Sequence, residues 1–449
     1  MLRGKVHNSK SMKRTGQKLW EKAKELIPGG NQLLSKRAEM FLPENWPAYF
    51  SKAKGPYIWD LDGKKYLDMS IMGIGACPLG YADPDVNTAV KRAVDRGSMA
   101  TWNTPDEVEL AKLLCKIHPW AHMVRYARTG GESMAVASRI ARAYTKRDVI
   151  AFCGYHGWSD WYLATNLKDP NGLNDHLLAG LEPNGVPEGL RGSIVPFHYN
   201  RIDELERIVQ QNKGRLAAII MEPIHSEEPK ENFLTKVREI ATKTGAVLVF
   251  DEISIGFKLT IGGAHLLYGV NPDMAVFSKG MSNGYPMAAI IGRKEVMQAA
   301  QDTFISSTYW TDSIGPAAAL ATIKKMQKHD IPKYLIKMGD RANKELAKLA
   351  EKHGINVKIE GTSTMGSFSF RYGADSNAVR TLFTQEMLAR GILASNRFYP
   401  SYAHTNKHLT VYVKAVDSVF ALMKKAIDED SVLKYLHGPV AHAGFQRLN

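Results

Sequence analysis

Residues 273–286, DMAVFSKGMSNGYP, join a short apolar run to a lysine that stands among small and turn-forming residues. The run predicts a buried strand, and Lys279 lies directly behind it, where an ammonium group costs free energy. Further apolar runs occur at 148–154, 216–224, 246–253 and 286–292, and helical windows occur between them and before them, at 106–118, 132–146 and 234–245. Strands that are apolar on both faces and alternate with helices indicate a mostly parallel sheet covered by helices, and hence an α/β fold.

The rest of the sequence predicts a smaller α+β domain. Residues 55–69, GPYIWDLDGKKYLDM, alternate apolar and polar residues around Asp62-Gly63, which indicates a β-hairpin. The central region is followed by a charged helix at 331–354, short strands at 363–373 and 408–415, and a closing helix at 418–429. We therefore predict a large domain at residues 76–325 and a small domain built from residues 1–75 and 326–449.

The composition, with 44% hydrophobic and 23% charged residues, is typical of a globular protein. The longest apolar runs fall far short of the roughly 20 residues that a membrane-spanning helix needs. The basic N-terminus has no apolar segment before a cleavage site, and Trp20, Ala23, Leu26 and Ile27 form a short helical stripe there instead. We expect no membrane partner and a cytoplasmic location.

A formal net charge of +14 raises the question of a nucleic acid partner. Lysine and arginine are spread along the chain and interleaved with acidic residues, without a basic-aromatic recognition motif, so none is predicted. A basic surface would instead attract an anionic substrate. The three cysteines, Cys77, Cys115 and Cys153, form no C-x-x-C pair, so neither a metal site nor a disulfide framework is predicted.

Polar residues follow several of the predicted strands. In an open parallel sheet, ligands bind outside the carboxyl ends of the strands, where these residues would lie. The residues are Tyr155, His156, Glu222, Asp251, Glu252, Ser278 and Lys279.

The turn RYARTGGES, residues 125–133, leads into a predicted helix. Backbone N–H groups of Thr129, Gly130 and Gly131, together with the helix dipole, would suit a phosphate. A plain N-cap by Thr129 or Ser133 is the alternative interpretation. Because neither a P-loop nor a dinucleotide motif is present, the phosphate would belong to another kind of cofactor.

Lys279 and Asp251 narrow the choice of cofactor. Burial favours the neutral amine that a Schiff base requires, and an aspartate can hold a pyridine nitrogen protonated, a pairing that marks pyridoxal phosphate (PLP) enzymes. An ion pair that caps two strands is the alternative. Tyr155, in FCGYHG, could stack on the cofactor ring or could be ordinary packing.

These residues belong to a longer ordered set of motifs, which resembles class III aminotransferases of the fold type I PLP enzymes, and most of all their glutamate-1-semialdehyde 2,1-aminomutase branch. The resemblance covers residues 20 to 430. It is carried by IPGG (27–30), YIWDLDGKKYLDM (57–69), VRYARTGGESMAVASRIARAYTKR (124–147), FCGYHGWSD (152–160), MEPI (221–224), FDEISIGF (250–257), PDMAVFSKGMSNGYP (272–286), STYWTDSIGPAAALAT (307–322) and SYAHT (401–405).

The resemblance implies a role for each matching residue. Lys279 would form the Schiff base with pyridoxal 5'-phosphate and move protons, and Asp251 would bind the pyridinium nitrogen. The other cofactor-binding residues would be Thr129, Gly130 and Gly131 around the phosphate, Tyr155 and Ile253 on the two ring faces, and His156 next to Tyr155. Thr308 would reach the cofactor phosphate of the neighbouring subunit, which implies a homodimer.

The chain also departs from the family pattern. The phosphate turn usually reads Ser-Gly-Thr, so Gly131 removes a hydroxyl, and Arg128 stands where asparagine is usual. Aminomutases usually carry a glutamate near the position of Asn396 and Arg397, which are the candidate substrate residues; Arg397 could pair with a carboxylate or lie at the surface.

Two enzyme functions follow from the resemblance. The first is an aminotransferase, which moves an amino group from a donor amino acid to a ketone or aldehyde through pyridoxamine 5'-phosphate (PMP). The second is a 2,1-aminomutase, which moves the amino group within one molecule. A basic nucleic-acid-binding or scaffold protein is a third hypothesis, against which the presence of both Lys279 and Asp251 argues.

Overall fold

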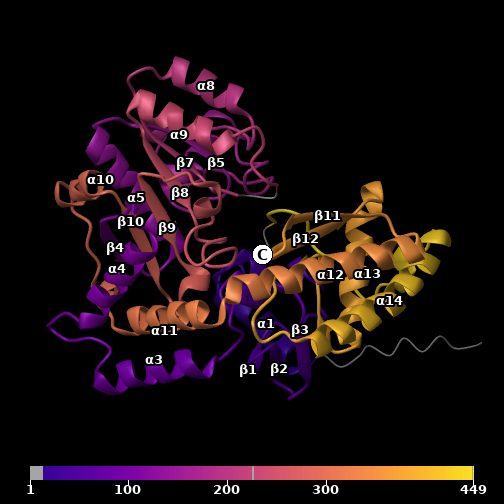
Figure 1. The fold of residues 1–449 in the computed structure, drawn as a ribbon. Helices are drawn as coiled ribbons and strands as arrows, with labels where there is room; N and C mark the ends of the chain where they lie inside the picture. Colours follow the sequence, from indigo (N-terminus) through magenta and orange to yellow (C-terminus); the bar gives the residue numbers. More distant parts are fainter. Residues whose placement is uncertain (1–13, 225–226, 447, 449) are drawn as a thin grey trace, which may run out of the picture.

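The computed structural model describes residues 14–224, 227–446 and 448 (Figure 1). A seven-stranded sheet has the order β4-β10-β9-β8-β7-β5-β6. Its strands are β4 (Met123–Ala127), β5 (Val149–Cys153), β6 (Ile194–Pro196), β7 (Leu216–Met221), β8 (Val247–Asp251), β9 (Met274–Phe277) and β10 (Ala288–Gly292). Strands β5 to β9 pair in parallel, which confirms the predicted sheet. Strand β10 is antiparallel to both neighbours, because no crossover helix separates it from β9.

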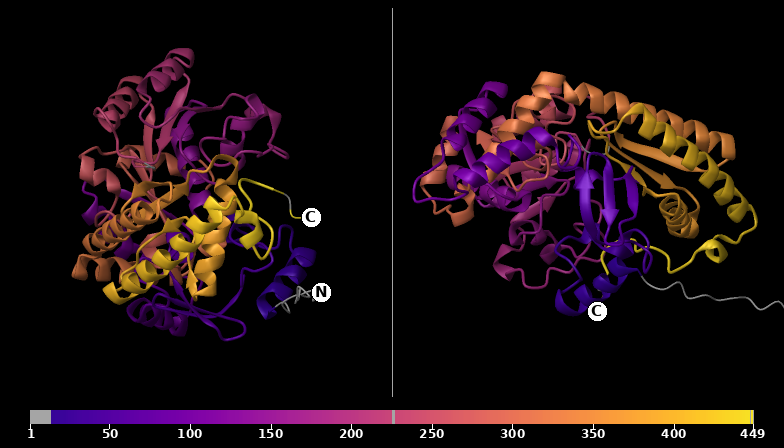
Figure 2. Two further views of the ribbon diagram at one scale, coloured as in Figure 1. Left: turned by 90° about the vertical axis from the view of Figure 1, so that its right-hand side faces the viewer. Right: turned by 90° about the horizontal axis from the view of Figure 1, so that it is seen from below.

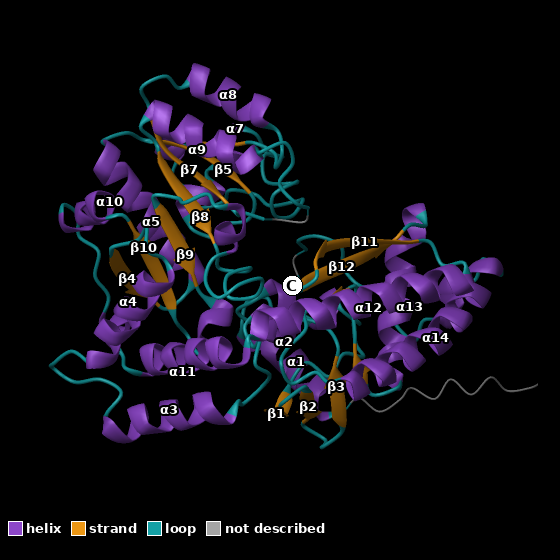
Figure 3. Cartoon of the chain, in the orientation of Figure 1, coloured by secondary structure: helices purple, strands orange, loops and turns teal. Residues whose placement is uncertain are grey.

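Helices lie on both sides of the large sheet (Figure 3), and alternate residues of its central strands belong to two different buried clusters. Val247 and Val249 of β8 pack in one cluster with α5 (Gly130–Thr145), whereas Leu248 and Phe250 pack in another with α9 (Phe233–Thr244). A sheet that is buried on both faces needs apolar residues at consecutive positions, which explains the uninterrupted apolar runs. The other helices of this part are α3 (Pro84–Arg96), α4 (Pro105–Ile117), α6 (Asp160–Leu163), α7 (Thr165–Lys168), α8 (Ile202–Gln211), α10 (Lys294–Gln298) and α11 (Ile314–His329).

The N-terminal hairpin joins the C-terminal part of the chain. Strand β3 pairs in parallel with β13, so the indigo N-terminal strands lie beside the orange and yellow C-terminal part of the chain (Figure 2). Leu67 and Met69 share a buried cluster with Phe383 and Phe420. The strands here are β1 (Phe50–Lys54), β2 (Tyr57–Asp60), β3 (Lys65–Asp68), β11 (Val357–Thr362), β12 (Met365–Phe370), β13 (Ile392–Leu393) and β14 (Arg397–Phe398), and the helices are α1 (Thr15–Leu26), α12 (Ile331–His353), α13 (Ser376–Ala389), α14 (Asn406–Asp428) and α15 (Val432–Tyr435).

The hairpin around Asp62-Gly63 and the strand within 363–373 are confirmed. The predicted strand at 408–415 is wrong, because these residues form the first part of α14. Their alternating β-branched pattern favours a strand locally, but Leu409, Tyr412 and Val416 are spaced by three and four residues and are all buried along one side of the helix. The boundary predicted at residue 325 lies inside α11, and the division into domains stays a prediction.

No helix in the described residues is long and apolar enough to cross a membrane. Cys77, Cys115 and Cys153 are free thiols.

Two buried histidines link stability to pH. The Nδ1 atom of His404 accepts a hydrogen bond from the Ser401 N–H at 2.9 Å, and its Nε2–H donates to the Asp68 carbonyl at 2.7 Å, so the ring is held in its neutral form. Burial lowers the pKa of His404 to about 4, and burial likewise lowers the pKa of His118 to about 4. Both side chains are inaccessible to solvent.

We expect the free energy of unfolding to fall as the pH is lowered from about 6.5 toward about 4. As the pH falls, the unfolded chain binds protons at these two histidines before the folded protein does. The stabilisation that the neutral rings provide is therefore complete above the pKa of histidine in the unfolded chain and is lost as the pH approaches their pKa in the folded protein. At about pH 5 each histidine should account for a loss of about 2 kcal/mol. Chemical denaturation at each pH in this range measures the free energy of unfolding. His404→Gln should make this free energy depend less on pH, whereas His437→Gln, at an exposed position, should leave its pH dependence unchanged.

Candidate active site

The carboxyl ends of β7, β8 and β9 bring several predicted site residues together. Asp251 is the last residue of β8 and pairs in register with Val276 of the adjacent β9, three residues before Lys279. The charges of Asp251 and Glu222 both act on the Lys279 amine, so the three side chains share one electrostatic environment. The titratable groups therefore meet at the carboxyl ends of the strands, which is the edge of the sheet where the sequence predicts a ligand site.

Asp251 is buried and hydrogen-bonded to His156. The Nδ1 atom of His156 lies 2.8 Å from Oδ2 of Asp251, and Oδ1 accepts the N–H of Ile253 at 3.0 Å. The other ring nitrogen, Nε2, lies 3.0 Å from the carbonyl oxygen of Cys153 and must donate to it. The contact between Nδ1 and Oδ2 therefore also holds one proton, carried by the imidazole or by the carboxyl group. His156 fixes the orientation of Asp251 through this contact.

Lys279 begins a 3-10 turn, η5 (Lys279–Ser282), with φ of +43°, which a non-glycine residue adopts at a cost in free energy. Its Nζ donates a hydrogen bond to the Ser254 hydroxyl at 2.6 Å. Burial lowers the pKa of Lys279; Asp251 and Glu222 partly oppose this shift, and Arg397 adds to it. The amine thus faces a neutral acceptor in a site that favours its unprotonated form.

The turn before α5 is built for close approach. The Thr129 hydroxyl caps the helix by accepting the Glu132 N–H, and the Glu132 carboxylate accepts the Thr129 N–H in return, so the N-cap interpretation of Thr129 holds. A β-carbon on Gly130 would lie 2.9 Å from the Ile253 side chain, and one on Gly131 would lie 2.8 Å from the Trp158 indole. Trp158 therefore occupies the space beside Gly131, the position at which the family usually has a threonine.

The two residues expected to flank a ring differ in exposure. Ile253 is 9% exposed and packs against Gly130 while its N–H bonds to Asp251. Tyr155 is 43% exposed, lies edge-on to Tyr162, and has its pKa raised by burial and by the charge of Asp251. Ile253 therefore contacts Asp251, and Tyr155 lies within range of the Asp251 charge.

Arg128 neither faces solvent nor points freely into the turn. It is 9% exposed and forms an ion pair with Asp312, whose backbone oxygen it also binds at 2.9 Å. This pair ties the turn to η7 (Thr308–Thr311). Thr308 itself is exposed, and in the described part of the chain no hydrogen bond joins it to the other predicted site residues.

Arg397 and Asn396 come from the distant strand β14 and its approach. The Asn396 carbonyl accepts the Phe368 N–H at 2.9 Å. Arg397 is exposed, forms no ion pair with any residue that the structure describes, and lies close enough to lower the pKa of Lys279. Strand β14 thus brings a guanidinium group into electrostatic range of Lys279.

Three residues near the site were missed by sequence reasoning. Ser254 binds Lys279, Trp158 packs on Gly131, and Lys258 is a buried lysine that donates a hydrogen bond to the Ser254 carbonyl. Only Lys258 carries a local signal, since a lysine between Phe257 and Leu259 in an apolar stretch is unusual.

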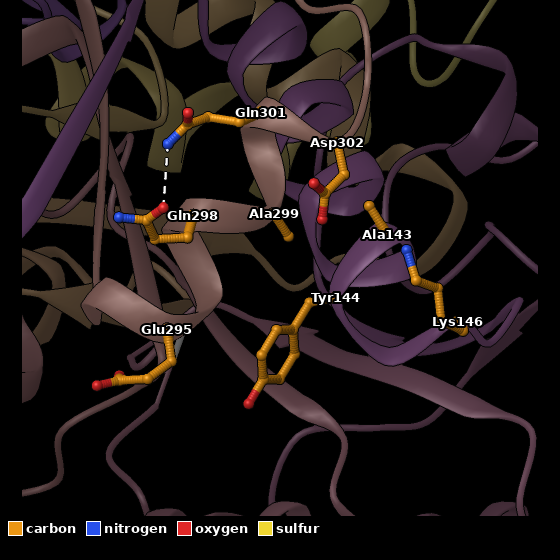
Figure 4. Close-up of a pocket in the computed structure, with 8 residues that line it drawn as sticks. All are labelled: Ala143, Tyr144, Lys146, Glu295, Gln298, Ala299, Gln301 and Asp302. Atoms are coloured by element: carbon orange, nitrogen blue, oxygen red, sulfur yellow. Dashed lines mark hydrogen bonds between the residues drawn. The ribbon is translucent and has the colours of Figure 1, made fainter.

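A surface pocket of about 390 Å³ lies elsewhere, at the other end of α5 (Figure 4). Its lining includes Tyr144, Lys146 and Glu295 and none of the predicted site residues. It is therefore separate from the candidate active site.

The residues present fit PLP. Gly130 and Gly131 form the start of α5, whose first backbone N–H groups suit a phosphate, Lys279 offers an amine whose pKa is lowered by burial to an aldehyde, and Asp251 offers an oriented carboxyl group to a pyridine nitrogen.

We expect Gly130→Ala to weaken PLP binding about tenfold and to lower the free energy of unfolding by about 1 kcal/mol, because the new methyl group meets the buried Ile253 side chain. Gly131→Ala is the matched control. Trp158 is 68% exposed and can move aside, so Gly131→Ala should weaken PLP binding by less than about threefold. Absorbance titration with PLP and thermal melting measure both variants. A larger effect of Gly131→Ala would contradict this account.

Comparison with known proteins shows the family of the chain. The family model described as aminotransferase class-III matches residues 43–427. The chain is 32% identical over 421 residues to the 3-aminobutyryl-CoA aminotransferase of Cloacimonas acidaminovorans (strain Evry), a match that covers 91% of this chain and 97% of that protein. It is 34% identical over 372 residues to glutamate-1-semialdehyde 2,1-aminomutase 2 of Lachnoclostridium phytofermentans, covering 80% and 84%.

A solved structure has the same fold. The PLP internal aldimine form of the FumI protein of Sphingopyxis sp. MTA144 superposes with a TM-score of 0.83 at 25% identity, covering 92% of this chain and 98% of that one. The chain therefore belongs to the class III aminotransferase family and is a PLP-dependent enzyme of the aminotransferase and aminomutase type.

Proposed function

We propose that the protein is an aminotransferase that moves an amino group from a carboxylate-bearing donor to a ketone or aldehyde, with Lys279 as the residue that bonds to PLP. The observation that carries this proposal is the state of Lys279. Its side chain is partly buried, its pKa is lowered by burial, and its hydrogen-bond partner is the neutral Ser254 hydroxyl rather than a carboxylate. A neutral amine is what nucleophilic attack on an aldehyde and proton abstraction from carbon require.

Other residues support the same chemistry. When bound, PLP acts as an electron sink that allows the α-hydrogen of an amino substrate to leave as a proton. Asp251, oriented by His156 and by the Ile253 N–H, would hold the pyridine nitrogen protonated. The Nζ atom of Lys279, when free, would accept the substrate proton and return it to the neighbouring carbon. Thr129, Gly130 and Gly131 would hold the phosphate at the start of α5.

Arg397 supports a carboxylate-bearing substrate. Its guanidinium group lies near Lys279 and forms no ion pair with the described residues, so its charge is available to a ligand. Arginine binds carboxylates through two parallel hydrogen bonds, which also orient them. We assign Arg397, with Asn396 beside it, to recognition of the donor carboxylate.

A 2,1-aminomutase is the second candidate, supported by the 34% identity to glutamate-1-semialdehyde 2,1-aminomutase 2 of L. phytofermentans. The aminotransferase takes precedence because Asn396 and Arg397 stand where aminomutases usually carry a glutamate. Turnover of one amino-aldehyde without a separate amino donor would favour the aminomutase over the aminotransferase.

We also propose a homodimer in which Thr308 reaches the site of the neighbouring subunit. Thr308 and Tyr309 are exposed, the latter at 72%, while Trp310 next to them packs against the core of the large sheet. The segment is thereby held firmly with its polar and aromatic side chains directed outward.

We expect L-glutamate to shift the visible absorbance of the PLP-loaded protein from the pyridoxal to the pyridoxamine form. Lys279→Ala should abolish this shift and reduce amino transfer by about a thousandfold or more, because the residue that moves the proton is lost. Lys344→Ala, at an exposed position on α12, is the control. Full amino transfer by Lys279→Ala would refute the assignment of Lys279.

We expect Arg397→Met to raise KM for acidic donors by about 10- to 100-fold, because the guanidinium–carboxylate hydrogen bonds are lost. Arg397→Lys should have a smaller effect, since it keeps the charge but not the paired geometry. Steady-state kinetics with L-glutamate and with an amine that lacks a carboxylate separates the cases: only the acidic donor should respond. Unchanged kinetics would remove Arg397 from the site.

A further inference from the structure

A buried ion pair lies directly before the turn at the start of α5. Arg128, which is 9% exposed, pairs through Nε with Oδ2 of Asp312, and its Nη2 donates a hydrogen bond to the Asp312 backbone oxygen at 2.9 Å. Its Nη1 donates to the Ala127 carbonyl at 3.1 Å and lies 3.4 Å from the sulfur of Met287. Every nitrogen of the guanidinium group therefore has a partner within the protein.

Asp312 connects this guanidinium group to two further elements. Its N–H donates to the Tyr309 carbonyl at 3.4 Å and so ends η7. Its Oδ1 accepts the N–H groups of Ile314 at 2.8 Å and Gly315 at 3.2 Å, at the start of α11. The Asp312 side chain is only 17% exposed. A single carboxylate thus joins the residue that follows β4, the end of η7 and the start of α11.

The candidate phosphate contacts lie on both sides of this ion pair. Thr129, the first residue of the turn, follows Arg128 directly, and Thr308 is the first residue of η7. Backbone N–H groups and hydroxyl groups bind a phosphate well only when the surrounding structure holds them in the required positions. Loss of one partner would leave the other charge buried and unpaired, so both segments would rearrange to expose it to water.

We propose that Arg128 is a positioning residue for the cofactor phosphate, which it does not bind itself but for which it fixes the turn and η7 through Asp312. This rests on the proposed function, in which residues 129–131 hold the phosphate of PLP and Thr308 reaches the phosphate in the neighbouring subunit. The positive charge beside the turn is used within the protein, on Asp312, and the ligands of the phosphate are the groups that this ion pair holds in place.

The test compares PLP with pyridoxal, which has the same ring and aldehyde but no phosphate. Each compound is titrated into the full-length protein freed of PLP, and the visible absorbance of the bound form gives its dissociation constant. The ratio of the two constants measures how much the phosphate contributes to binding. A variant that only weakens folding leaves this ratio unchanged, and far-ultraviolet circular dichroism verifies that each variant is folded.

Asp312→Asn should weaken PLP binding about tenfold and leave pyridoxal binding unchanged, because the buried ion pair is lost while the asparagine oxygen can still cap α11. Arg128→Met should have the same effect. The double variant should be no worse than either single variant, because both substitutions remove the same contact.

Arg238→Met is the matched control. Nη1 of Arg238 pairs with Oδ2 of the buried Asp273 at 2.9 Å, and Asp273 directly precedes β9, at the end of the strand away from Lys279. Loss of this ion pair should leave the ratio of the two dissociation constants unchanged.

The opposite result has a clear form. If Arg128 were itself a ligand of the phosphate, Asp312→Asn would free its guanidinium group, and PLP binding would stay the same or become tighter. That outcome would overturn the proposal, and so would equal losses of PLP and pyridoxal binding or additive effects in the double variant. Asp312→Asn separates the two roles by itself, so the proposal stays testable if Arg128→Met does not fold.

The outcome is also separate from that of the proposed function. A changed ratio in Asp312→Asn of a protein that transfers no amino group would leave the role of Arg128 standing and refute the aminotransferase. Amino transfer by the wild type, together with an unchanged ratio in Asp312→Asn, would do the reverse.

Discussion

The partial burial of the Lys279 side chain, whose amine has no carboxylate partner among the described residues, is the constraint on which the rest of the site depends. A charged amine in such a place would be costly, so the surroundings must favour its neutral form. Ser254 supplies a neutral acceptor, while Asp251 and Glu222 act on the amine only from a distance. The strained backbone of Lys279, with φ of +43°, is tolerated because flanking strands and turns hold it there.

The sheet explains how these groups meet. Parallel strands place their carboxyl ends along one edge, and the register of β8 on β9 sets Asp251 close to the turn that carries Lys279. His156, in the loop after β5, fixes the orientation of Asp251 through a hydrogen bond. The side chain of Ile253 packs against Gly130 at the start of α5. The seven-stranded sheet and its loops therefore bring the candidate cofactor-binding residues together, whereas the candidate substrate residue Arg397 comes from β14.

Local sequence patterns predicted most of the fold because the clearest patterns, the apolar runs and the helical windows, belong to segments that are buried in the structure. The uninterrupted apolar runs became the strands of the large sheet, and the window at 132–146 became α5 almost residue for residue. The failure at 408–415 has a physical cause. The alternation of HLTVYV matches a strand over a few residues. Burial of Leu409, Tyr412 and Val416 in one apolar cluster instead stabilises a helix of more than twenty residues.

The sequence by itself determined the fold class, the PLP family and the identity of Lys279 and Asp251 as candidates, because ordered motifs and apolar periodicity are properties of neighbouring residues. Only the tertiary structure decided the partners of these residues. Arg128 pairs with Asp312, His156 with Asp251, and Lys258 meets Lys279 across Ser254. Such contacts join segments that are up to 184 residues apart, and side-chain packing, which no local pattern encodes, sets their direction.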